Sequence, residues 1–174
     1  MVSTSTAKDL SAGLNRHQSY PYIGYAAPES LQREDARILQ EELHCTAVRT
    51  SHYPQSQYFL DECDRRGLLV FTELPGCSTI GDDNWKDAAC EMLQEMLLQN
   101  RNHPSIILWG VRINESVDDD AFYARTTKSP ISWTPAVLPP ACAIWKKAIC
   151  WRMFTPTTIF PQRHKRPVLS LKRT

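Results

Sequence analysis

A carboxylic acid and an amide follow directly on an apolar segment in the second half of this chain. Residues Ile106–Val111 form the apolar segment, and Arg112, Asn114 and Glu115 come after it. An unbroken apolar run is typical of a strand covered on both faces, and ligands in parallel α/β folds bind at the carboxyl ends of such strands. A carboxylic acid beside an amide that can hold a hydroxyl indicates chemistry on a polyol. The alternative is that Asn114 and Glu115 are ordinary residues at the start of a helix.

Other polar side chains also stand where a strand is expected to end. Gly13–His17 is interpreted as the end of a short strand, and Cys45–Thr50 as a second strand that runs into Ser51-His52-Tyr53-Pro54. Leu68–Glu73 is apolar enough for a buried third strand and finishes on a carboxylate. Parallel strands bring their carboxyl ends to one edge of a sheet, so these groups and Glu115 are expected at the same edge.

These segments resemble barrel strands of glycoside hydrolase family 2, the family of bacterial β-galactosidases and β-glucuronidases. Asn102–Trp109, followed by Asn114-Glu115-Ser116, is similar to the fourth barrel strand of that family. The sextet Arg49–Pro54 is the same as in the family's β-galactosidases, and Gly13–His17 resembles the Gly-x-Asn-Arg-His motif of the first strand. The resemblance extends over about residues 13–125.

The resemblance implies a retaining glycosidase that hydrolyses β-galactosides or related β-glycosides. Glu115 would be the general acid/base, which gives a proton to the leaving oxygen and then takes one from water. Asn114 would contact the sugar 2-hydroxyl, and the remaining predicted substrate-binding residues are His17, His52, Arg49 and Asn15. Each of these residues could instead have a structural role. Each histidine could form a hydrogen bond with a nearby backbone group, and Arg49 could either pair with a carboxylate in the barrel mouth or order a loop.

We expect no cofactor and no metal. Some β-galactosidases of the family bind Mg²⁺ beside the acid/base through a Glu-x-His after the third strand. Here Glu73-Leu74-Pro75-Gly76-Cys77 stands in that place. Glu73 is expected to make a structural or site-lining hydrogen bond rather than to act as the nucleophile.

Helical periodicity separates the predicted strands and gives a strand–helix alternation of about four βα units. This predicts an α/β fold, a partial (β/α)₈ TIM barrel, because a complete barrel needs about 250 residues and the chain has 174. The loop from Gln18 to Ala27 carries three tyrosines, which could stack on sugar rings or simply pack. The expected helices are Pro28–Leu43, Gln55–Arg66, one capped by Asp82 or Asp83 that ends near Asn102, and one that begins over Asp118–Arg125.

The composition changes near residue 126. All 19 acidic residues lie at or before Asp120, whereas 10 of the 20 basic residues follow it. We therefore expect three regions: an irregular head (1–12), a half TIM barrel (13–125) and a basic, proline-rich tail (126–174), the tail being out of frame or disordered. Val2–Lys8 and Ser132–Leu138 can each be encoded by codons that, read in a shifted frame, give sequences typical of the family. A disrupted reading frame is therefore the sharper hypothesis for the head and the tail.

Three functional alternatives follow from this organisation. The first is the family's glycosidase, present as a truncated fragment that is inactive alone because the strand of the nucleophile is missing. The second is a non-catalytic, frame-disrupted barrel fragment, and the third is a basic-tailed binding protein. We expect no nucleic acid or membrane partner, a cytoplasmic location with reduced cysteines, and association with itself or with a complementing fragment through open sheet edges.

Overall fold

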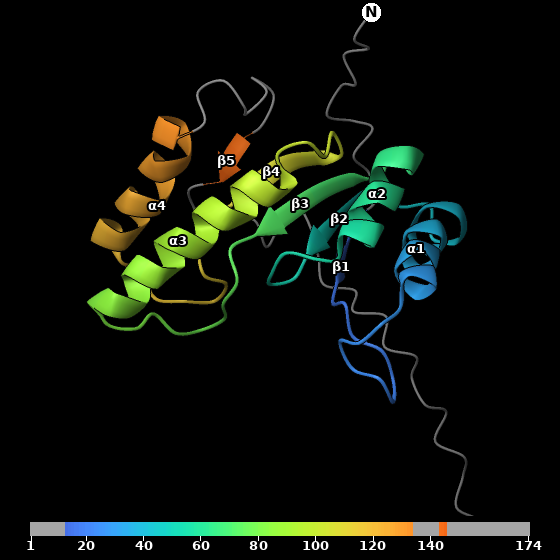
Figure 1. Ribbon diagram of the computed structural model, residues 1–174, viewed down its shortest axis with the longest axis horizontal. Coiled ribbons are helices and arrows are strands. Elements are labelled where there is room, and N and C mark those ends of the chain that lie inside the picture. The colour runs from blue at the N-terminus through green and yellow to red at the C-terminus, as the bar shows by residue number, and fades with distance from the viewer. Residues whose placement is uncertain (1–12, 134–142, 146–174) are drawn as a thin grey trace, which may run out of the picture.

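The computed structural model describes residues 13–133 and 143–145, which form one parallel sheet with helices between its strands (Figure 1). The strands lie in the order β1-β2-β3-β4-β5, and every neighbouring pair is parallel. No helix among these residues is long and apolar enough to cross a bilayer. The elements are β1 (Gly13–Arg16), α1 (Glu29–Arg37), η1 (Ile38–Glu42), β2 (Ala47–Thr50), α2 (Gln57–Arg66), β3 (Leu69–Glu73), α3 (Asp83–Asn100), β4 (Ile106–Gly110), α4 (Asp120–Trp133) and β5 (Ala143–Trp145).

The predicted α/β alternation is confirmed, and local chemistry explains where its helices begin and end. Asp82 caps α3, because its Oδ1 accepts a hydrogen bond of 2.9 Å from the Trp85 backbone N–H. Gly67 ends α2 in the left-handed conformation, with φ of 70°. Pro28, expected inside the first helix, is instead its N-cap with an extended backbone. The last part of that predicted helix is the π-helical turn η1, closed by a bond of 3.0 Å from Leu43 N to Ile38 O.

The fourth helix and the fifth strand move the predicted end of the barrel. The half barrel was expected to end at Arg125, but α4 continues to Trp133 and β5 pairs with β4 in parallel. Ala143 lies beside Leu108 in this pairing. This region was expected to be out of frame or disordered, yet α4 extends into it and β5 forms there. The predicted head, 1–12, and the rest of the predicted tail lie outside the described residues.

The two faces of the sheet have different neighbours. Val48, Val70 and Trp109 belong to the buried core, together with apolar side chains of the helices, among them Phe59 and Leu93. Successive strand side chains point to opposite faces, so the residues between these belong to the other face. That face is only partly covered at β4, which was expected to be buried on both faces: Ile107 and Leu108 are partly exposed. The register between β3 and β4 shifts at Val70/Phe71, which interrupts the strict alternation between the buried Ile106 and Trp109.

Arg16 fixes the first strand to the helices behind it. Its guanidinium donates hydrogen bonds to Asp35 Oδ2 at 3.0 Å from Nε and to Gln32 Oε1 at 2.8 Å, and it also bonds Gln55. The same group lies over the Phe59 ring, 4.0 Å from its centroid. Buried charge is tolerated only when it is paired and hydrogen-bonded. These partners from α1, from the segment just before α2 and from α2 itself meet that need for Arg16.

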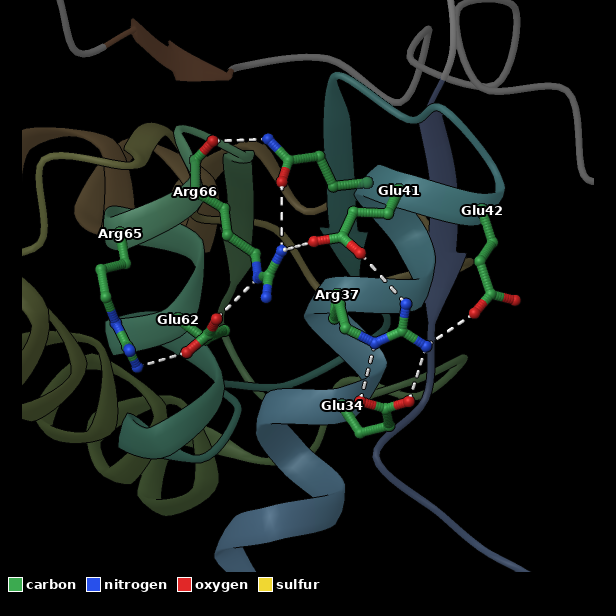
Figure 2. A network of polar contacts seen from close by, with 8 residues as sticks. Glu34, Arg37, Glu41, Glu42, Glu62, Arg65 and Arg66 are labelled. Atoms are coloured by element: carbon green, nitrogen blue, oxygen red, sulfur yellow. Dashed lines mark hydrogen bonds and ion pairs between the residues drawn. The ribbon is translucent and has the colours of Figure 1, made fainter.

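A second set of charges joins α1 and η1 to α2 on the surface (Figure 2). Arg37 contacts Glu34 at 2.7 Å, Glu41 at 3.1 Å and Glu42 at 2.6 Å, and Arg66 of α2 contacts Glu41 at 2.6 Å. We call this set, with Glu62 and Arg65, the helix charge network. Its glutamates are largely exposed apart from Glu62, so solvent screens most of its contacts.

Candidate active site

The register of the parallel strands brings polar side chains together at their carboxyl ends. Asn15 of β1 lies beside Arg49 of β2, and Arg49 lies beside Phe71 of β3. Glu73, the last residue of β3, lies beside Gly110 of β4. Residues that share a register position share a face of the sheet, so the partly open face ends in a cluster of polar groups. The loops after β1–β4 leave the sheet at this edge (Figure 1).

Arg49 is the centre of this cluster. Its Nε donates to Glu73 Oε1 at 2.8 Å, and its Nη2 donates to Asn114 Oδ1 at 2.8 Å. The Arg49 and Glu73 side chains are only 12% and 9% exposed, so the ion pair is shielded from water. Of the two roles left open for Arg49, pairing with a carboxylate at the mouth is the one that the structure has. The pair also aligns Asn114, the residue before Glu115.

The second carboxylate oxygen of Glu73 faces His52. Oε2 is buried and has no hydrogen-bond partner among the described residues, and it lies 3.7 Å from His52 Nδ1. His52 Nδ1 also lies 3.4 Å from Arg49 Nη2. Gly110 makes room for this arrangement, because a Cβ there would lie 2.8 Å from Glu73 Cγ and 2.9 Å from a Phe71 ring carbon. A glycine at this position therefore lets the carboxylate reach Arg49 and His52.

Two histidines from neighbouring strand ends meet in this cluster. The ring centroids of His17 and His52 are 5.3 Å apart and nearly perpendicular, and the ring of Tyr53 is 6.1 Å from that of His17. Partial desolvation, with the nearby His52 and Arg49, lowers the pKa of His17 from its ordinary value. The lowered pKa favours the neutral imidazole, in which one ring nitrogen can accept a hydrogen bond and the other can donate one.

The loop after β4 carries Asn114 and Glu115 and is not part of a helix. Since α4 begins only at Asp120, the alternative that these two are helix N-terminal residues is wrong. Asn114 is 9% exposed, and its backbone oxygen accepts a bond of 2.7 Å from Ser78 N. Its side-chain nitrogen lies 3.5 Å from Cys77 Sγ. The loop after β3 therefore supports Asn114 in addition to Arg49.

Glu115 is exposed, with a left-handed backbone of φ 55°, and makes no hydrogen bond to the residues that the structure describes. A non-glycine residue in this conformation is uncommon and is often found at functional sites. The neighbouring Arg112 contacts Asp118, and its guanidinium lies 4.0 Å from the centroid of the Tyr123 ring, so this arginine orders the loop.

The structure thus brings together the predicted residues Asn15, His17, Arg49, His52 and Asn114 at one edge, with Glu115 beside Asn114. Sequence reasoning missed Gly110 and Cys77, which shape the cluster without a motif of their own. Among the described residues one group of ligating side chains could hold a metal ion: Asp61, Asp64 and His103. It belongs to α2 and to the turn before β4, away from this cluster. Asp64 there accepts from Ser105 N at 2.9 Å and lies 2.6 Å from His103 Nδ1, which are structural contacts.

Comparison with known families and sequences identifies similar proteins. The model of the family described as "Glycosyl hydrolases family 2, TIM barrel domain" matches residues 7–136. A beta-galactosidase from Thermoanaerobacterium thermosulfurigenes is 63% identical over 116 residues, which are 67% of this chain and 16% of the relative. A putative beta-glucuronidase from Formosa agariphila is 37% identical over 103 residues, 59% of this chain and 12% of the relative. The chain thus spans a small part of the curated relatives that it matches.

Solved structures agree with the sequence matches. A GH2 beta-galacturonidase from Eisenbergiella tayi, bound to galacturonate, superposes with a TM-score of 0.62 and 31% identity. The superposition covers 72% of this chain and 24% of the other. A beta-glucuronidase from Parabacteroides merdae gives a TM-score of 0.62 at 28% identity and covers 72% and 17% of the two chains.

Proposed function

We propose that this chain, which belongs to glycosyl hydrolases family 2 and matches its TIM barrel domain, supplies the acid/base half of an active site. The complete site would hydrolyse β-galactosides with retention of configuration. One observation carries this proposal. Arg49 holds Asn114 at 2.8 Å and Glu73 at 2.8 Å, which places the Asn114-Glu115 pair at the strand edge where His17 and His52 also lie.

In the proposed reaction Glu115 gives its proton to the leaving oxygen and then takes one from the attacking water. Asn114 is fixed through Oδ1 by Arg49, so its amide group is held in place to contact the sugar 2-hydroxyl. Asn15 Oδ1 is buried without a hydrogen-bond partner among the described residues, and we assign it the role of accepting a hydrogen bond from a sugar hydroxyl. His17 and His52 supply ring nitrogens to further hydroxyls.

The described residues lack a second carboxylate suited to be the nucleophile. A retaining glycosidase needs two carboxyl groups about 5 Å apart. Glu73 is the other carboxylate of the cluster, but its charge is neutralised by Arg49 and its oxygens are buried. A nucleophile must attack the sugar directly, and Glu73 is not placed to do so. We therefore propose that the isolated chain does not turn over substrate.

A neutral sugar suits this cluster better than a uronic acid. The carboxylate of a uronic acid requires a cation, and Arg49, the arginine of the described cluster, is already paired with Glu73. The relatives include both beta-galactosidases and a putative beta-glucuronidase. The pairing of Arg49 favours the β-galactoside among them.

Mg²⁺ does not fit the described cluster, and we propose a reaction without a metal or other cofactor at this edge. The carboxylate that could bind the ion is Glu73, and the guanidinium of Arg49 lies 2.8 Å from its Oε1. A divalent cation placed there would be repelled by that charge.

Two further proposals concern the setting of the chain. The open face of the sheet and the edge strand β1 favour association with a second copy or with a complementing remainder of the barrel, because unpaired strand edges and apolar surface tend to find partners. A cytoplasmic location agrees with the free thiols of Cys45, Cys63, Cys77 and Cys90.

The test combines this chain with the rest of a barrel. The purified chain is assayed on a chromogenic β-galactoside alone, and again after mixing with a polypeptide that carries the remaining barrel strands of the Thermoanaerobacterium relative. We expect no turnover alone, turnover in the mixture, and a loss of about 10²–10⁴-fold in the mixture for Glu115→Gln. A mixture in which Glu115→Gln is as active as the unchanged chain would remove Glu115 from the acid/base role. Turnover by the chain alone would refute its proposed inactivity.

A further inference from the structure

The loop between β1 and α1, residues 17–28, exposes large rings beside the candidate site. We call it the tyrosine loop. Tyr20, Tyr22 and Tyr25 are 46%, 104% and 64% exposed, and Ile23 is 43% exposed. The sequence left two alternatives for these tyrosines, packing or contact with a ligand. Their exposure does not agree with packing within the described part of the chain.

The backbone of a closed turn holds Tyr22 in its exposed position. Tyr20 N donates to Gly24 O at 3.0 Å and Gly24 N donates to Tyr20 O at 2.9 Å, so the turn is closed on both sides. Tyr22 at the tip has φ of 72°, in the left-handed region that bulky residues rarely adopt. Both this conformation and the exposure of an aromatic ring are unfavourable, and such combinations occur where a side chain serves a ligand.

The base of the tyrosine loop is attached to the candidate site through Tyr53. The Tyr53 hydroxyl accepts a hydrogen bond of 3.0 Å from Gln18 N, and Gln18 Oε1 accepts one of 2.7 Å from Ser56 N. The ring of Tyr53 lies 6.1 Å from that of His17 on one side and 5.8 Å from that of Tyr25 on the other. A continuous series of rings therefore leads from the site histidine to the exposed loop.

The chemistry of the loop defines what it can hold. Residues 17–28 contain no Asp, Glu, Lys or Arg, so the loop offers no charge partner to an ionic ligand. Tyrosine presents an apolar face for stacking and a hydroxyl for hydrogen bonding, which suits an uncharged ring with polar substituents. We propose that the tyrosine loop binds the aglycone of the β-glycoside, the part that extends outward from the sugar; this rests on the proposed function.

The test compares two galactosides that differ only in the aglycone. Dissociation constants of methyl β-D-galactoside and phenyl β-D-galactoside are measured with the full chain, with Tyr22→Ala and with Tyr58→Ala. Tyr58 is the matched control, because it is a tyrosine of α2 that is 46% exposed and lies outside the loop. We expect Tyr22→Ala to weaken the binding of phenyl β-D-galactoside by about three- to tenfold and to leave the binding of methyl β-D-galactoside unchanged. Tyr58→Ala should change neither dissociation constant.

The two proposals fail in different measurements. Asn114→Ala is expected to weaken both galactosides equally, so unchanged binding in that variant counts against the proposed function. An equal affinity of the unchanged chain for both galactosides, or a phenyl-to-methyl ratio that survives Tyr22→Ala, overturns the role of the loop. A sedimentation coefficient altered by Tyr22→Ala with an unaltered ratio would identify the loop as a contact between copies, and the proposal would be wrong.

Discussion

Two groups of charged residues in this protein have similar members and different surroundings. The helix charge network joins α1 and η1 to α2 on the surface (Figure 2), and Arg37 there contacts glutamates that are 46–55% exposed. The Arg49–Glu73 pair lies at the strand ends with side chains 12% and 9% exposed. Both use arginine and glutamate at distances below 3 Å for their closest contacts.

Burial, rather than the number of contacts, decides what each group does. Exposed ion pairs gain little, since water and salt screen them and long side chains lose freedom. A buried charge that loses its partner is left without compensation, and the loss is large. Substitutions in the helix charge network should therefore change stability little. Arg49 and Glu73, in contrast, depend on each other and hold Asn114 in position.

Glu73→Ala tests the comparison with the largest expected effect. The substitution leaves Arg49 buried without its carboxylate, and we expect a loss of about 3–5 kcal/mol in the free energy of unfolding. Urea denaturation measures it, with Glu73→Gln as the control that keeps an acceptor and loses less. The comparison is broken if Glu73→Ala is no more damaging than Glu41→Ala in the helix network.

A smaller effect is expected from the pH dependence of His17. The native state lowers the pKa of His17, chiefly by desolvation. As the pH falls below the ordinary value of 6.5, the unfolded chain binds a proton that the native state resists, so stability falls. His17→Gln removes this loss, so between pH 7.5 and pH 5 the free energy of unfolding should fall less in the variant than in the unchanged chain. We expect the difference to be less than about 1 kcal/mol, because His17 is exposed.

Denaturation at the two pH values measures this difference. If His17→Gln loses more stability than the unchanged chain between pH 7.5 and pH 5, the sign is wrong.

The smallest effect is expected for Arg37→Gln in the helix network. Hydrogen bonds from Arg37 and from Arg66 lower the pKa of Glu34 and Glu41, so any stabilisation is present above the ordinary carboxylate range and is lost as the pH falls through it. We expect a change in denaturation midpoint close to the measurement error at neutral pH, and none in 1 M NaCl. A loss comparable to that of Glu73→Ala would show that exposure does not separate the two groups.

Most of the elements could be predicted because their signals are local. The apolar runs predict β3 and β4, the helical period predicts α3, and Gly67 ends α2 as its type suggests. The residue types along α3 do not by themselves give its buried face: Met92 is 37% exposed, while Cys90 is 8% exposed. Neighbouring elements decide the buried face, and periodicity does not contain them.

The candidate site was predicted as a set of strand-end residues but not as a set of contacts. The bond between Arg49 and Asn114 joins residues 65 positions apart, so it depends on the order and register of three strands. The family motifs supplied most of these residues and the end of the third strand supplied Glu73, but the register decides which of them touch one another. The end of α4 and the strand β5 were missed because the sequence after residue 125 has no sustained helical or strand period.

Gly110 has a consequence for the order in which this domain can change during evolution. A side chain at this position would meet Glu73 Cγ at 2.8 Å, so glycine can be replaced only in a lineage that has already shortened or moved the acid. Loss of the acid in turn leaves Arg49 unpaired. The three positions are therefore expected to be inherited as one unit among homologues, and a survey that finds Gly110 replaced while Glu73 and Arg49 remain would show another path.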